Sequence, residues 1–240
     1  MANFVLVHGG WRGGWIWKRV AQQLRRAGHD VYTPTLSGLA ERGHLIHLGI
    51  NLSTHIQEVT NLIHFEDLGN VILCGHSYAG MVISGVADRA AQSISALVYL
   101  DAWFPKDGDS IMTLSPEAYR LGAIEAARGH HGFAVTPIPP AVLGVNEADR
   151  ALVETKATPH PLATMTEAIQ LEGNHLRVET KMYVLATEWG PSPFAQFYTQ
   201  LADDPSWTAR LVPSGHDVML DRPDAVNALL LEAAGAPQQI

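Results

Sequence analysis

The stretch VILCGHSYAGM, residues 71–81, decides the fold that this sequence predicts. Its first residues form an apolar run typical of a buried strand, and the residues from Tyr78 onwards have the pattern of a helix. Between them, Gly75-x-Ser77-x-Ala79 matches the G-x-S-x-G elbow that exposes a nucleophilic serine, although alanine holds the fifth place and glycine follows one residue later. Because this turn is tight, small residues are needed, and the setting favours Ser77 as a nucleophile over a serine that only caps the helix.

Strands and helices alternate on both sides of this turn. We expect strands at 3–8, 30–34, 70–75, 94–101, 181–187 and 207–212. We expect helices at 15–27, 54–67, 78–89, 194–202 and 221–234, the first ended by Gly28 and the second opened by a Thr54-x-x-Gln57 capping box. This alternation predicts an α/β fold with a doubly wound, mostly parallel sheet.

The alternation stops in residues 103–179, where prolines cluster and no clear strand occurs. We interpret this segment as a helical cap inserted after the strand that ends at Leu100. Residues 1–102 and 180–240 then form the core.

Composition narrows the range of partners and compartments. The chain has 240 residues, a net charge of −8 and no block of Lys or Arg, which argues against nucleic acid and membrane partners. The single cysteine, Cys74, excludes an internal disulfide, lies in an apolar run typical of a buried thiol, and fits a reducing compartment. With no signal-peptide pattern and no long apolar stretch, we expect a cytoplasmic protein.

A glycine pair follows the first expected strand. His8-Gly9-Gly10 stands where a second oxyanion donor is needed, and glycine lets a backbone N–H approach a substrate oxygen closely. We expect the N–H groups of Gly10 and Tyr78 to form the oxyanion hole.

His216 is the candidate base among twelve histidines. It lies in a Pro-Ser-Gly loop after the last expected strand, and a histidine can take and return a proton near neutral pH. His44 and His47 have ligand-like spacing but no third ligand, so we expect no metal and no cofactor.

The acid that orients this base has two candidates, each at a strand end. Asp101 follows an apolar strand directly, and burying an unpaired charge there would be costly, so the position favours a functional role. Glu188 lies in a Glu-Trp-Gly-Pro turn and stays as the alternative. For Asp217, next to the base, we expect a surface or capping role.

Together these residues resemble a known family. The chain is similar to bacterial small esterases, including the type that hydrolyses the carbamate carbendazim, which are related to plant methylesterases and hydroxynitrile lyases within the α/β-hydrolases. The resemblance covers essentially the whole chain, through the motifs VLVHGGWRGGWIWKRV, YTPTLSGLAERGHL, THIQEVTNLIHFEDLGNVILCGHSYAGMVISGVADR, LVYLDAWFPKDG, TPHPLATMTEAI and GHDVMLDRPD.

The resemblance implies Ser77 as nucleophile, His216 as base, and Gly10 with Tyr78 as oxyanion donors. Bacterial members often have glycine where Ala79 stands. The plant enzymes take their acid from the strand end that holds Glu188 here, whereas haloalkane dehalogenases of the wider fold use the strand end that holds Asp101. The lyases carry a lysine and a hydroxyl residue where this chain has Asp217 and Gly9, which argues against lyase activity.

We therefore expect a serine hydrolase that cleaves a small, mostly apolar ester or carbamate through an acyl-enzyme, as a monomer or homodimer. Trp103 and the cap should roof the pocket, with further aromatic candidates near its mouth at Trp11, Trp15 and Trp189. A hydroxynitrile lyase, a C–C bond hydrolase and a slow-turnover ligand receptor remain as alternatives on the same frame.

Overall fold

Six parallel strands form the central sheet, in the order β2-β1-β3-β4-β7-β8. The computed structural model describes residues 1–235. The strands are β1 (Asn3–Val7), β2 (Asp30–Tyr32), β3 (Val71–His76), β4 (Ile94–Leu100), β7 (Thr180–Ala186) and β8 (Thr208–Val212). The expected strands are all present, each within about two residues of its expected ends.

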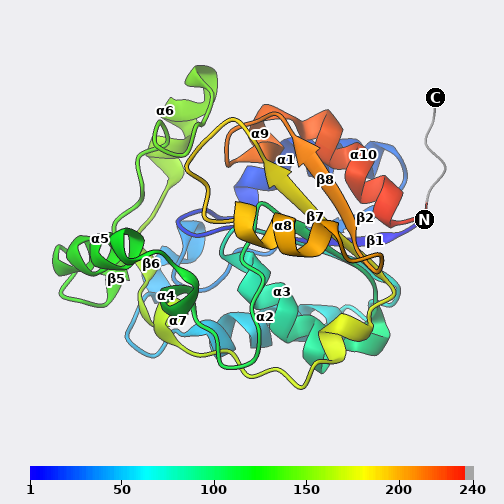
Figure 1. The fold of residues 1–240 in the computed structure, drawn as a ribbon, viewed down its shortest axis with the longest axis horizontal. Helices are drawn as coiled ribbons and strands as arrows, with labels where there is room; N and C mark the ends of the chain where they lie inside the picture. The colour runs from blue at the N-terminus through cyan, green and yellow to red at the C-terminus, as the bar shows by residue number, and fades with distance from the viewer. Residues whose placement is uncertain (236–240) are drawn as a thin grey trace.

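Helices cover both faces of this sheet (Figure 1). One face packs against α1 (Lys18–Arg26), α9 (Val218–Asp221) and α10 (Pro223–Ala233), and the other against α2 (Leu52–Phe65), α3 (Ala79–Arg89) and α8 (Ala195–Ala202). Successive residues of β4 and β7 point to opposite faces of the sheet and pack alternately in one hydrophobic core and the other. This is expected of a sheet buried on both sides. The predicted fold class is confirmed.

Among residues 1–235, no helix is both long and apolar enough to cross a membrane.

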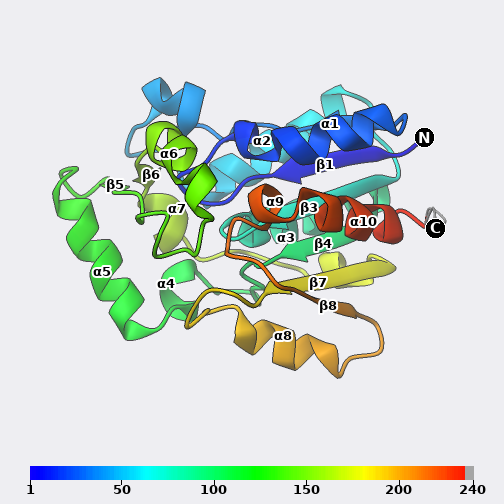
Figure 2. The same ribbon diagram turned by 90° about the horizontal axis from the view of Figure 1, so that it is seen from above.

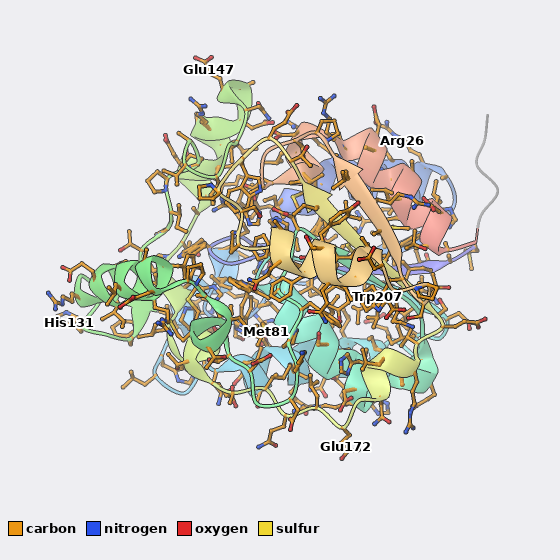
Figure 3. The ribbon with its side chains drawn as sticks, viewed as in Figure 1. Arg26, Met81, His131, Glu147, Glu172 and Trp207 are labelled. Carbon is orange, nitrogen blue, oxygen red and sulfur yellow. The ribbon has the colours of Figure 1, made fainter. Side chains whose placement is uncertain are left out.

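Much of the chain between β4 and β7, including α5 (Glu117–Arg128) and α6 (Glu147–Lys156), lies beyond one end of the sheet (Figure 2). This segment also contains α4 (Ile111–Leu114), β5 (Ala134–Val135), β6 (His160–Pro161), α7 (Ala163–Thr166) and the 3₁₀ turn η4 (Asn174–Arg177). The expectation that this segment has no strand was wrong, because β5 and β6 pair antiparallel over two residues each. Strands this short show no alternation in sequence. In Figure 3, His131 and Glu147 mark outer points of this segment, while Met81 of α3 lies centrally.

Several predicted helix ends are corrected by the capping geometry. Asn51, not Thr54, caps α2: its side chain accepts a hydrogen bond from the Thr54 N–H at 2.9 Å. The predicted first helix begins as the 3₁₀ turn η1 (Gly14–Trp17), and Gly28 follows α1 with a φ of +86°, as expected. The last predicted helix, 221–234, corresponds to α10, which begins at Pro223, and the short α9 that precedes it was not predicted. The remaining 3₁₀ turns are η2 (Ala40–Leu45) and η3 (Ala91–Ser93).

The turn between β3 and α3 is built from small residues for identifiable reasons. Ser77 has a φ of +55°, the left-handed conformation that a serine adopts only where its surroundings impose it. A Cβ on Gly75 would lie 2.7 Å from the Ala79 carbonyl oxygen, and one on Gly80 would lie 1.9 Å from the Trp103 carbonyl oxygen. Ala79 is fully buried, and the next residue, Gly80, has no room for a side chain.

Exchanging the small residues at Ala79 and Gly80 should lower stability by unequal amounts. Gly80→Ala should lower the free energy of unfolding by at least ~2 kcal/mol, since the methyl group collides with fixed backbone. Ala79→Gly should cost only about 0.5–1 kcal/mol, through helix entropy. Urea unfolding of both variants measures the difference, and equal stability of the two would contradict this description of the turn.

Candidate active site

Three side chains from three loops form one hydrogen-bonded chain. Ser77 follows β3, Asp101 follows β4, and His216 lies between β8 and α9. His216 Nε2 lies 2.9 Å from Ser77 Oγ, and His216 Nδ1 lies 2.6 Å from Asp101 Oδ2. Because an ionised carboxylate only accepts, Nδ1 carries the proton and Nε2 is free to accept the serine hydroxyl proton. The structure thus brings together the three residues that the sequence suggested for nucleophile, base and acid.

Asp101 has no exposed surface, and its carboxylate is held by several donors. Oδ1 accepts the Ala186 N–H at 3.1 Å, and Oδ2 accepts the Trp189 Nε1–H at 2.9 Å in addition to His216. Burial raises the pKa of Asp101, and these hydrogen bonds act against that rise by stabilising the charged form.

Glu188, the alternative acid, lies apart from this chain. Its side chain is exposed, while its backbone N–H donates to the Ser214 carbonyl at 2.9 Å. The neighbouring residue, Trp189, is the one that turns towards Asp101. The geometry therefore favours Asp101, not Glu188, as the partner of His216.

The loop after β1 lies against the serine turn. A Cβ on Gly9 would lie 2.7 Å from His76 Nδ1 and 2.9 Å from Ser77 Cβ, so only glycine fits there. A Cβ on Gly10 would meet Tyr78 Cβ only at 3.9 Å, so Gly10 borders Tyr78 without crowding. Within residues 1–235, neither the Gly10 nor the Tyr78 N–H donates to a protein acceptor. These are the two donors expected to form the oxyanion hole.

His8 fixes the orientation of this loop. Its Nδ1–H donates to the Gly9 carbonyl at 2.8 Å, and its Nε2 accepts the Leu36 N–H at 3.1 Å. Burial lowers the pKa of His8 to about 4, which keeps the ring neutral and allows both bonds. Because the peptide is planar and trans, a Gly9 carbonyl directed at His8 turns the Gly10 N–H away from it.

The tryptophans expected near the site have different positions. Trp11 has a φ of +61°, and its indole N–H donates to the Val135 carbonyl at 2.9 Å, which ties the loop to β5. Trp103 is buried, and its ring lies 5.0 Å from that of Phe194, which stacks on His216 at 5.4 Å. Trp15 instead lies half-buried against the core on the α1 and α10 face of the sheet, with Lys156 Nζ 5.5 Å from its ring.

The sequence did not reveal several buried polar residues around the site. Arg12 donates to Asp217 Oδ2 through Nε and Nη2, at 3.2 and 3.0 Å. Burial disfavours a charged Asp217, but Arg12 lowers its pKa overall. Asp217 is thus a buried ion-pair partner, which corrects the expected surface role. The pair joins the loop after β1 to the residue that follows the base.

Three further histidines lie around the serine turn. His76 Nε2–H donates to the His216 carbonyl at 2.9 Å, and burial lowers the pKa of His76 to about 3. His55 Nδ1 lies 2.8 Å from the Tyr78 hydroxyl, and the His160 ring packs 4.6 Å from the Tyr78 ring. A lone histidine in sequence gives no sign of such contacts, because its partners are distant along the chain.

This fold and this arrangement are those of a known family. The model of the Alpha/beta hydrolase family matches residues 4–229, so the chain belongs to that family.

Individual proteins of known sequence or structure show which members of this family the chain resembles. It is 44% identical to the carbendazim hydrolyzing esterase of Nocardioides sp. (strain SG-4G), over 93% of this chain and 96% of that protein. It is 26% identical to putative methylesterase 19 of Arabidopsis thaliana, over 97% of each. Among solved structures, an extracellular alpha/beta-hydrolase from a Paenibacillus species superposes with a TM-score of 0.85 at 23% identity, covering 97% of this chain and 99% of that one. The chain is thus an α/β-hydrolase related to the plant methylesterases.

Two isosteric substitutions separate the candidate acids. Asp101→Asn should reduce kcat for ester hydrolysis by about 10³- to 10⁴-fold, since the amide favours the wrong tautomer of His216. Glu188→Gln should stay within about two-fold of the parent chain, because its exposed side chain contacts neither His216 nor Ser77. A large loss of kcat in the Glu188 variant alone, with both variants folded by circular dichroism, would overturn the assignment.

Proposed function

We propose that this protein is a serine esterase that hydrolyses small, uncharged esters or carbamates through an acyl-enzyme. The observation that carries the proposal is the hydrogen-bonded chain from Asp101 through His216 to Ser77 Oγ. In such a chain, the histidine can remove the proton of the serine hydroxyl as the serine attacks a carbonyl carbon.

The reaction follows from these positions. His216 Nε2 takes the proton as Ser77 Oγ attacks the carbonyl carbon, and the resulting oxyanion accepts hydrogen bonds from the Gly10 and Tyr78 N–H groups. The bond to the leaving alcohol breaks, and His216 returns the proton to the alcohol oxygen. Water then attacks the acyl carbon as His216 Nε2 takes its proton, the bond from the acyl carbon to Ser77 Oγ breaks, and His216 gives the proton to Oγ. This releases the carboxylic or carbamic acid and restores the serine hydroxyl.

Asp101 contributes by holding the imidazole. Its negative charge stabilises the imidazolium that forms in each step, and its bond to Nδ1 keeps Nε2 aimed at the serine. A carbamate passes through the same tetrahedral oxyanion, so the same groups serve both substrates.

The substrate class is supported by an apolar cavity of about 550 Å³ between α5, β5 and the loop after β1. The cavity lies beside the triad and is not lined by Ser77 or His216. No charged side chain is among its lining residues, which include Trp11, Tyr119, Ala123, Val135, Ile138 and Pro139. Trp11 directly follows the proposed donor Gly10. At the other side, Tyr119 contacts Trp103, whose neighbour Phe194 stacks on His216. An apolar cavity favours uncharged, flat or aliphatic groups.

The relative named for carbendazim hydrolysis supports the carbamate part of the proposal. We propose further that the enzyme acts on a dissolved substrate in the cytoplasm, as a monomer or homodimer, without a nucleic acid or membrane partner. The net charge of −8 and the single, buried Cys74 support this setting.

Ser77→Ala provides the direct test. The parent protein should release p-nitrophenol from p-nitrophenyl acetate in a burst of one equivalent, and should cleave carbendazim as a carbamate probe. Ser77→Ala should abolish the burst and lower kcat by about 10⁴-fold or more, because no acyl-enzyme can form.

Ser206→Ala, at an exposed serine outside the site, is the matched control and should behave as the parent. Full esterase activity in Ser77→Ala would refute the proposed function. Activity on the ester without cleavage of carbendazim would restrict the proposal to esters.

A further inference from the structure

Trp189 contacts both partners of the acid–base pair. Its indole Nε1–H donates to Asp101 Oδ2 at 2.9 Å, the same oxygen that lies 2.6 Å from His216 Nδ1. Its ring centroid lies 4.6 Å from that of His216. It follows β7, at the strand end where the sequence offered Glu188 as an acid. The loop after β7 therefore places a neutral N–H donor, that of Trp189, against the carboxylate of Asp101, which follows β4.

We propose that Trp189 is a positioning residue that holds the Asp101 carboxylate in register with His216 and limits the negative charge that this carboxylate presents to the base. This inference rests on the proposed function and adds a role to a residue that touches neither Ser77 nor the oxyanion donors.

The positioning part follows from the shared oxygen. Within residues 1–235, the His216 N–H would be the one donor left on Oδ2 without Trp189, so this oxygen could move with the imidazole while Oδ1 stays bonded to the Ala186 N–H. Here the Ala186 N–H holds Oδ1 at 3.1 Å, and Trp189 holds Oδ2 from a second direction. With both oxygens held, His216 Nδ1 has one fixed acceptor, and its Nε2 stays directed at Ser77.

The electrostatic part follows from how carboxylate charge is distributed. A donor on Oδ2 stabilises the charged carboxylate and reduces the negative potential that it presents to the imidazole. Less potential at Nδ1 means less stabilisation of the imidazolium. Because the base acts only when neutral, this donor extends activity towards lower pH.

No other group around His216 duplicates this donor. The titratable groups that interact electrostatically with His216 include Asp101, His76 and Asp217. His76 lies 4.5 Å away ring to ring and is neutral, and Asp217 is paired with Arg12 at 3.0 Å. Phe194 stacks on the ring without a polar atom. Within residues 1–235, the other side-chain bond to Asp101 is that of His216 itself.

Trp189→Phe removes the N–H and keeps an aromatic ring beside His216. We expect the acid limb of the kcat/KM profile for p-nitrophenyl acetate to move up by about 0.5–1 pH unit, because the freed carboxylate charge stabilises the imidazolium. Well below the midpoint of that limb, this shift gives a loss of about three- to ten-fold in kcat/KM, while the alkaline plateau changes less. The low-field proton resonance of the Asp101–His216 bond should shift in the same variant.

Two further variants separate this role from simple packing. Trp189→Leu removes ring and donor, and should lower the plateau kcat further than Trp189→Phe while showing the same pH shift. Trp207→Phe is the control, because Trp207 packs on Tyr99 and Phe104 away from the site. It should leave the acid limb of the kcat/KM profile unchanged. Reaction with a fluorophosphonate counts active sites in each sample.

An unmoved acid limb and an unshifted resonance in Trp189→Phe would overturn the inference. So would equal losses at every pH in the Phe and Leu variants, which would mark Trp189 as packing alone. These failures are distinct from failure of the proposed function, which would be seen as turnover in Ser77→Ala.

Discussion

A carboxylate with no contact to water is the constraint around which this site is organised. Asp101 lies at the tip of a central strand, and an ion there is tolerated only where donors replace its hydration. Those donors come from the end of β7, from the loop that follows it, and from the loop after β8. Because β4, β7 and β8 are neighbours in the sheet, the strand order itself supplies them. The base is thus held by the groups that make the buried charge possible.

The parts of the site that could be predicted are those that a short stretch of sequence specifies by itself. The serine turn, the glycine pair after β1 and the loop histidine each combine a strand end with a residue type that the chemistry requires. The sequence did not decide whether Asp101 or Glu188 is the acid that orients His216, because both residues follow strands that end at the same edge of the sheet. What separates them is side-chain direction: Asp101 points into the site, and Glu188 is exposed. A sequence pattern does not give that direction for residues beyond a strand.

The contacts that could not be predicted join distant parts of the chain. Arg12 pairs with Asp217, which lies 205 residues away in the chain, and the backbone N–H of Trp11 donates to His160 Nδ1, which lies 149 residues away. Helix limits shifted for a related reason, since the cap at Asn51 depends on side-chain geometry that several polar residues could offer. The need for a small residue was recognised at Ala79, but the obstructing backbone comes from Trp103 and acts on Gly80. Periodicity predicts elements, whereas these contacts arise only when elements pack.

The central claim is that Ser77 is the nucleophile and that its reactivity comes from His216 and Asp101. Fluorophosphonate labelling followed by peptide mass mapping tests this most directly, since the reagent bonds only to an activated hydroxyl. One adduct per chain should form on Ser77, and its rate should fall sharply in Asp101→Asn. An adduct on another residue, or an equal labelling rate in Asp101→Asn, would contradict the claim.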